Sequence, residues 1–101
     1  TVPCEACGGL LKPAVVFFGQ MLPAEVMSRA YAAAARSDVV LVVGSSLAVG
    51  TASYGMQAGM GNGARLVIIN RGPTFYDSRA DLRIEGGASE TLTYLSQLLG
   101  A

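Results

Sequence analysis

Two short segments of the chain are apolar at every position rather than at every second one. They cover residues 39–43 and 66–69. An unbroken run of this kind predicts a strand buried on both faces, as in a parallel sheet. Small or polar residues follow each run. We therefore expect strands over residues 38–43 and 65–70.

Apolar side chains recur at helical spacing before the first of these strands. In residues 23–36, Val26, Ala30 and Ala33 fall on one helical face. Pro23 suits the first helical position, where a backbone N–H would have no partner in the helix. The alanines at the end of this segment predict a helix packed closely on the sheet.

A Gly-rich segment, residues 51–60, connects the two apolar runs. Its length fits a crossover helix, so the three elements together predict a right-handed βαβ unit. Gly55 and Gly59 weaken such a helix unless it packs closely against a neighbour.

Weaker patterns complete the prediction. An apolar strand is expected over residues 13–19 and a loop over 71–74. The alternation in residues 80–85 indicates an edge strand, and Ser89 is expected to cap a last helix. The apolar face of that helix would consist of Leu92, Leu95, Leu98 and Leu99. The fold class is therefore α/β, a partial Rossmann-like parallel sheet with flanking helices.

Cys4 and Cys7 stand near the start of the chain, and Gly8 and Gly9 follow them. Two thiolates at this spacing on a tight turn can face one tetrahedral Zn²⁺, and the glycines allow the turn to close. A redox C-x-x-C motif is the rival interpretation, although that motif usually opens a helix; a structural disulfide is a third. Because zinc needs four ligands, we interpret residues 1–12 as half of a zinc-binding module.

Three groups of small and polar residues end the expected strands. They are Gly44-Ser45-Ser46, Asn70 and Gly86-Gly87-Ala88. The carboxyl ends of parallel strands share one sheet edge, where α/β sheets bind ligands. Backbone N–H groups and hydroxyls suit a phosphate or ribose, although each group alone also fits an ordinary turn. The chain has neither a G-x-G-x-x-G nor a Walker loop, so it would supply only part of a dinucleotide site.

Composition narrows the functional classes. The 101 residues are 51% hydrophobic, with seven basic and seven acidic residues and no His. Balanced charge gives no reason to expect nucleic acid or an anionic membrane as a partner. No apolar run has the length of a membrane span, and no signal peptide opens the chain. Without His or a spaced carboxylate pair, we assign no catalytic residue to this chain.

The order of motifs along the whole chain resembles one family. Cys-x-x-Cys-Gly-Gly-Leu-Leu-Lys-Pro comes first, followed by Val-Val-Phe-Phe-Gly-Gln-Met-Leu-Pro and Leu-Val-Val-Gly-Ser-Ser-Leu-Ala-Val. Val-Ile-Ile-Asn and Asn-Arg-Gly-Pro-Thr complete the series. In this order the motifs resemble the C-terminal part of sirtuins, the NAD-dependent protein deacylases.

The resemblance implies roles for particular residues. Cys4 and Cys7 match the second pair of a four-cysteine structural zinc site. The positions that match NAD contacts are Gly44, Ser45, Ser46, Asn70, Arg71, Gly72 and Ala88. The positions that match the acyl-lysine tunnel or the two segments that clamp the substrate peptide are Val16, Phe18, Gly19, Gln20, Leu47, Ala48 and Val49. Main-chain pairing of this kind binds a peptide largely without reading its sequence.

The resemblance also implies that the chain is the C-terminal half of a catalytic domain. Residues 1–12 would complete the zinc module, and residues 13–101 would form the later part of a Rossmann-like NAD-binding domain. The phosphate loop, the catalytic His and the first C-x-x-C belong to the other half. We expect the complete protein to transfer an acyl group from lysine to the ADP-ribose of NAD, releasing nicotinamide. A chain that begins at Thr1 without that half should be inactive alone.

Two departures from the sirtuin pattern concern the peptide clamp. Gln20 stands where Glu is usual, and Gly50-Thr51 replaces the common Tyr-Pro, which implies a looser clamp. The Gly-Ser-Ser and Asn-Arg-Gly-Pro-Thr segments are most similar to a mitochondrial and bacterial branch with lipoamidase-type members. That similarity implies a bacterial cytoplasm or a mitochondrial matrix rather than secretion.

Two other functional interpretations stay open. The chain could be a non-catalytic nucleotide-binding or interaction domain, of the architecture found in the middle domains of thiamine-diphosphate enzymes. Such a domain needs no zinc. It could also be an inert fragment that does not fold alone.

Overall fold

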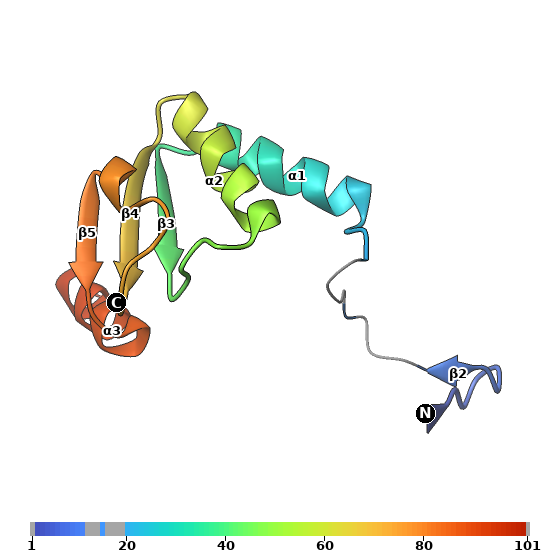
Figure 1. Ribbon diagram of the computed structural model, residues 1–101. Helices are drawn as coiled ribbons and strands as arrows, with labels where there is room; N and C mark the ends of the chain where they lie inside the picture. The colour runs from blue at the N-terminus through green and yellow to red at the C-terminus, as the bar shows by residue number, and fades with distance from the viewer. Residues whose placement is uncertain (1, 12–14, 16–19, 101) are drawn as a thin grey trace.

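A computed structural model describes residues 2–11, 15 and 20–100 (Figure 1). Its main body is a parallel sheet with the strand order β3-β4-β5, and helices flank this sheet, which confirms the predicted α/β class. The elements are β1 (Val2–Pro3), β2 (Leu10–Leu11), α1 (Ala24–Ala35), β3 (Val39–Val43), α2 (Gly50–Gly61), β4 (Arg65–Asn70), the 3₁₀ turn η1 (Asp77–Arg79), β5 (Leu82–Glu85) and α3 (Ala88–Leu98). The strand expected over residues 13–19 lies outside the described residues, apart from Val15, which is in no regular element.

The two apolar runs form β3 and β4, and they pair in parallel from Val39↔Arg65 to Val43↔Ile69. The Gly-rich segment between them forms α2, the expected crossover helix. On the other side of β4, strand β5 pairs in parallel and ends the sheet. The alternating pattern of residues 80–85 was therefore a correct indication of an edge strand.

The core lies between α2 and one face of the sheet. Leu66 and Ile68 of β4 are fully buried, and they pack with Met56 of α2. A Cβ atom on Gly59 would lie 2.6 Å from Cγ2 of Val40 and 3.0 Å from the backbone oxygen of Ala34. There is no room for a side chain at residue 59. Helix α2 therefore packs closely against its neighbours, as its glycines predicted.

Helix α1 packs mainly against α2 (Figure 1). The alanines near its end contact that helix rather than lying directly on the sheet. The prediction that this helix packs on the sheet was therefore wrong. The backbone of Ala34 approaches Gly59, and the ring of Tyr31 lies 3.6 Å from the position of a Cβ on Gly55. Small residues on both helices permit this approach.

One face of β3 is open, contrary to the prediction that residues 39–43 are buried on both faces. Val39 is 51% exposed and Leu41 is 48% exposed. Strand β3 is at the edge of the described sheet, and α2 covers only the face that carries Val40 and Val42. On the opposite face α3 approaches β4, where Ile69 is fully buried.

The last helix begins two residues earlier than expected. Its N-cap is Gly87, with extended backbone, and Thr91 donates its N–H to the oxygen of Gly87 (3.1 Å). Ser89 therefore lies inside the first turn, and its expected role as cap was wrong. The apolar face is present but poorly covered, since Leu92, Leu98 and Leu99 are exposed.

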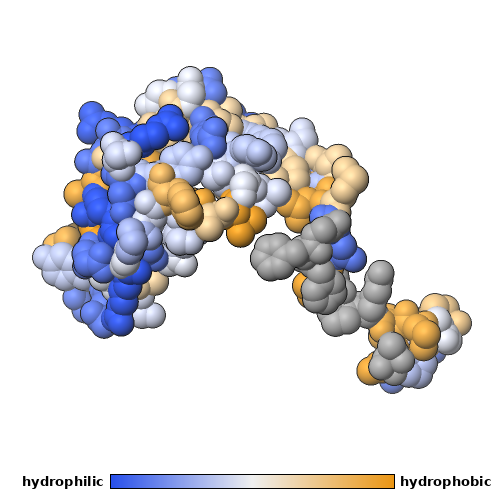
Figure 2. Space-filling view, in the orientation of Figure 1, coloured by the Kyte–Doolittle hydropathy of each residue, from blue (hydrophilic) through white to orange (hydrophobic). Residues whose placement is uncertain are grey.

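Strands β1 and β2 form a small antiparallel hairpin around the two cysteines. Figure 2 shows apolar side chains on this hairpin and near one end of α1, whereas hydrophilic side chains gather over β5 and α3. Within the part of the chain that the structure describes, no helix is long and apolar enough to cross a membrane.

Candidate functional site

The carboxyl ends of β3, β4 and β5 meet at one edge of the sheet (Figure 1). Gly44, directly after β3, donates its N–H to the oxygen of Ile69 in β4 (2.8 Å). Gly86, directly after β5, donates to the oxygen of Asn70 (3.3 Å). The structure thus brings together the three groups of small and polar residues that the sequence placed at strand ends.

The turn after β3 has an unusual backbone. Gly44 has a φ of +67°, and Leu47 has a φ of +62° although it carries a side chain. Such a conformation costs about 1–3 kcal/mol at a residue other than glycine. The side chain of Leu47 is buried against Met56, and its N–H donates to Oγ of Ser45 (3.1 Å). Core packing therefore holds this turn, and its strained backbone lies at the edge where a ligand is expected.

The segment after β4 is held by polar contacts. The amide nitrogen of Asn70 donates to the oxygen of Gly72 (3.2 Å), and Gly72 has a φ of +92°. Arg71 is exposed and forms an ion pair with Glu90 of α3 (3.2 Å). A Cβ on Gly87 would lie 2.7 Å from Nη2 of Arg71, so this guanidinium spans the edge from β4 to the start of α3. Ala88, the first residue of that helix, is half-buried.

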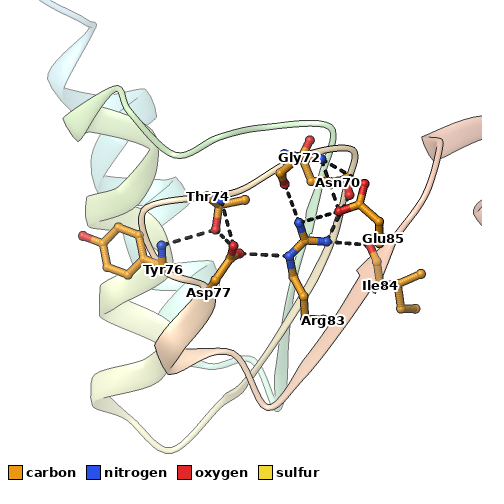
Figure 3. Close-up of polar contacts among 8 residues, drawn as sticks. All are labelled: Asn70, Gly72, Thr74, Tyr76, Asp77, Arg83, Ile84 and Glu85. Atoms are coloured by element: carbon orange, nitrogen blue, oxygen red, sulfur yellow. Dashed lines mark hydrogen bonds and ion pairs between the residues drawn. The ribbon is translucent and has the colours of Figure 1, made fainter.

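A charged network that the sequence did not indicate lies behind this edge (Figure 3). Arg83 of β5 contacts Asp77 (2.9 Å) and Glu85 (3.1 Å), and it donates to the backbone oxygens of Asn70 (3.0 Å) and Gly72. The sequence showed only an Arg at a polar position of an edge strand. The two carboxylates that it contacts, Asp77 and Glu85, are six and two residues away along the chain, which is no regular spacing.

Asp77 joins this network to the loop after β4. It accepts the N–H of Thr74 (3.0 Å) and the hydroxyl of Thr74 (2.5 Å). The hydrogen bond from the Thr74 hydroxyl, with that from its N–H and the nearby Arg83, lowers the pKa of the Asp77 carboxyl below its usual value. The carboxylate form is thereby favoured, and its charge is matched by Arg83.

The loop after β4 also contacts the turn after β3. Phe75 donates its N–H to the oxygen of Ser46 (3.0 Å). A pocket of about 200 Å³ is lined by Pro73, Thr74 and Phe75. The two candidate ligand segments therefore form one connected surface.

The Cys4–Cys7 turn has features that suit a metal. Gly8 has a φ of +73°, and Cys4 donates its N–H to the oxygen of Gly9 (2.6 Å), so the turn is closed. The N–H groups of Cys7 and then Ala6 lower the pKa of the Cys4 thiol, which favours the thiolate that binds metals. Both cysteines are free, whereas a structural disulfide would join them. They lie between two strands, whereas a redox C-x-x-C motif usually opens a helix.

This turn offers two ligands. Among residues 2–11, 15 and 20–100, no group of three or more His, Cys, Asp or Glu side chains is placed to hold a metal ion. The thiols fit zinc as half of a tetrahedral site, and two further ligands would have to come from elsewhere.

The expected substrate residues are only partly described. Val16, Phe18 and Gly19 lie outside the described residues, and Gln20 is exposed at a bend. Ala48 and Val49 are exposed directly before α2, whereas the side chain of Leu47 is in the core. Any contact of Leu47 with a peptide would therefore use its backbone.

Comparison with known proteins gives one consistent result. The model of the Sir2 family matches residues 1–51. The chain is 44% identical over 92 residues to the NAD-dependent protein deacetylase 1 of Pyrobaculum aerophilum, covering 91% of this chain and 36% of that protein. It is 49% identical over 89 residues to the NAD-dependent protein deacetylase of Caldivirga maquilingensis, covering 88% of this chain and 34% of that protein. The chain thus spans about a third of the length of these curated relatives.

Solved structures agree with the sequence matches. The structure of Sir2Tm bound to a propionylated peptide is similar with a TM-score of 0.84 and 31% identity, over 98% of this chain and 42% of that one. A complex of Sir2 with a p53 peptide and NAD⁺ is similar with a TM-score of 0.83 and 32% identity, over 97% of this chain and 41% of that one.

Proposed function

Since the chain belongs to the Sir2 family, we propose that the protein that carries it is an NAD-dependent lysine deacylase and that this chain supplies part of its NAD and peptide sites. The convergence of Gly44, Asn70 and Gly86 at one sheet edge is the observation that carries the proposal. The names of the relatives support NAD-dependent deacetylation. Removal of other acyl groups is our extension, consistent with the propionylated peptide bound by Sir2Tm.

The residues at this edge fit a dinucleotide. The turn at residues 44–46 carries the hydroxyls of Ser45 and Ser46 and the backbone N–H groups of these two residues, which are donors for phosphate and ribose oxygens. The Asn70 amide is a partner for ribose hydroxyls. Ala88 begins an α-helix with a small side chain, which permits close approach of an adenine ring. NAD, when bound, supplies the ADP-ribose that accepts the acyl group and releases nicotinamide.

The peptide would lie against the exposed segment before α2. Ala48 and Val49 are exposed there, and an extended peptide gains affinity from main-chain hydrogen bonds. The substrate lysine would then lie beside the nucleotide, because residues 44–46 and 47–49 are consecutive. No residue of this chain is His, so an imidazole base would have to come from residues outside it, and we propose that the chain alone is inactive.

Zinc would have a structural role in this protein. Cys4 and Cys7 would supply two of its four ligands, and the metal would hold the β1–β2 hairpin. This role requires no contact between the metal and the reacting groups.

The test is NAD-dependent deacylation of an acetyl-lysine peptide by the full-length protein that carries this chain. We expect nicotinamide release that depends on the peptide, and we expect Asn70→Ala to raise the KM for NAD about tenfold, the effect of about 1.4 kcal/mol. The matched control is Asn62→Ala. Asn62 caps the far end of α2, where its amide bonds to Ala58 (2.9 Å), so the KM should be unchanged.

Other outcomes separate the proposal from its alternative. NAD binding without nicotinamide release, in protein that contains no stoichiometric zinc, would favour a non-catalytic nucleotide-binding domain. Absence of both NAD binding and deacylation in folded full-length protein would overturn the proposal.

A further inference from the structure

Arg83 holds the ends of two strands and a loop together. Its Nη1 donates to the backbone oxygen of Asn70 (3.0 Å) at the end of β4 and to that of Ile84 (2.9 Å) in β5. Its Nη2 donates to the oxygen of Gly72, which also accepts the amide of Asn70 (3.2 Å). The Asn70 side chain and Arg83 therefore share one acceptor, as Figure 3 shows.

Hydrogen bonds hold Gly72 through both its carbonyl oxygen and its N–H group. Its oxygen accepts from Arg83, and its N–H donates to the carboxylate of Glu85 (2.9 Å), which Arg83 also contacts (3.1 Å). Gly72 has a φ of +92°. A glycine in a free loop can adopt many backbone conformations. The contacts from β5 select one of these alternatives.

A second series of hydrogen bonds leads from Arg83 to the turn after β3. Nε contacts Asp77 (2.9 Å), and Asp77 binds both the N–H and the hydroxyl of Thr74. The next residue, Phe75, donates to the oxygen of Ser46 (3.0 Å). Both candidate nucleotide segments are thus connected to one guanidinium.

We propose that Arg83 is a positioning residue for the nucleotide, setting the place of the Asn70 amide and of the Ser46 turn through the loop between them. This inference rests on the proposed function. Arginine suits the task because its planar fork serves several acceptors in fixed directions, whereas lysine has a single ammonium group. The Arg83 side chain is only 23% exposed. When this side chain is removed, water therefore replaces its hydrogen bonds to the acceptors poorly.

The experiment measures NAD affinity and steady-state kinetics of Arg83→Met and Arg83→Lys in the full-length protein. For Arg83→Met we expect the dissociation constant and the KM for NAD to rise about tenfold, equivalent to about 1.4 kcal/mol. The KM for the peptide and kcat should stay within about twofold, because a positioning effect on one ligand changes ground-state binding. Arg83→Lys should give an intermediate rise, and millimolar guanidinium should partly restore the NAD affinity of a third variant, Arg83→Ala.

Arg79→Met is the matched control. Arg79 is exposed, and its guanidinium lies 5.7 Å from the ring centre of Tyr76. Tyr76 joins the Arg83 network only through its backbone N–H, which donates to the hydroxyl of Thr74 (3.2 Å). Removal of Arg79 takes one positive charge from the same region, and the KM for NAD should be unchanged.

The outcomes decide between positioning and a merely structural role. An Arg83→Lys protein that keeps wild-type NAD affinity overturns the proposal, as does a fall in Tm without a selective change in the KM for NAD. If Arg83→Met does not fold, Arg83→Lys alone decides the question by the same criterion. A folded wild-type protein that binds no NAD refutes the proposed function itself, and the inference with it.

Discussion

At the scale of single residues, Asp77 is the junction between the loop after β4 and strand β5. It accepts two hydrogen bonds from Thr74, and an ion pair joins it to Arg83. The Thr74 hydroxyl, followed by the Thr74 N–H and Arg83, lowers the pKa of the Asp77 carboxyl. The folded state therefore favours the carboxylate form of Asp77, and the contribution of Asp77 to the stability of the fold depends on pH.

Asp77→Asn should lower the Tm at pH 7 and lose this effect in acid. A carboxyl whose pKa is lower in the folded state stabilises the fold above its unfolded pKa of about 3.9, and the contribution is lost as pH falls through the folded value. The Tm difference between the wild type and Asp77→Asn should therefore be constant above about pH 5 and narrow below about pH 4.

Thermal unfolding followed by circular dichroism between pH 3 and pH 7 measures this difference. Asp38→Asn is the control for the loss of one negative charge, because Asp38 is exposed just before β3. A Tm difference for Asp77→Asn that is as large in acid as at pH 7 would count against this account.

At the scale of elements, α2 is defined by its contacts more than by helix propensity. Four of its twelve residues are glycines, which are poor helix formers. Gly59 compensates by allowing Val40 and the backbone of Ala34 to approach on two sides. The helix is therefore stable as the layer between α1 and the sheet.

Gly59→Ala should destabilise the chain by about 1–3 kcal/mol, the usual cost of overpacking a core position. Its Cβ would lie 3.0 Å from the oxygen of Ala34, which is backbone and cannot rotate away. Gly61→Ala is the matched control in the same helix, because nothing lies within 4 Å of a Cβ at that position. It should leave stability unchanged or raise it by about 0.5–1 kcal/mol. Equal effects of the two substitutions in urea unfolding would contradict the close contact at Gly59.

At the scale of the whole molecule, the sheet has one covered face and one partly open face. Residues Leu66 and Ile68 form the core with α2, whereas Val39, Leu41 and Leu82 expose apolar surface. Burial is greatest in β4, where Leu66, Ile68 and Ile69 are fully buried.

Hydrogen exchange of the isolated chain should follow this distribution. We expect the slowest amide exchange in β4, at Ile68 and Ile69, because these residues are fully buried in the middle of the sheet. The amides of Val2, Leu10 and Leu11 in β1 and β2 should exchange fast, since these strands have two residues each and every residue is exposed. Uniformly fast exchange would support the alternative of an inert fragment.

Local patterns by themselves determined the elements and the edge where they converge. Unbroken apolar runs predicted β3 and β4, and a spacer of helical length predicted a parallel crossover between them. Because parallel strands end at a common edge, the meeting of Gly44, Asn70 and Gly86 followed from the sequence. The motif order likewise indicated the family, which the match to residues 1–51 confirmed.

Only the tertiary structure decided which surfaces are covered and how the loops at that edge are held. An apolar run does not indicate whether other elements cover one or both faces of a strand, so the open face of β3 could not be predicted. Leu47 has a positive φ because its side chain reaches the core, which no local pattern indicates. The contacts of Arg83 join residues from β4, η1 and β5 at no regular spacing. Such a network forms only after the strands are paired, since pairing brings its members within hydrogen-bonding distance.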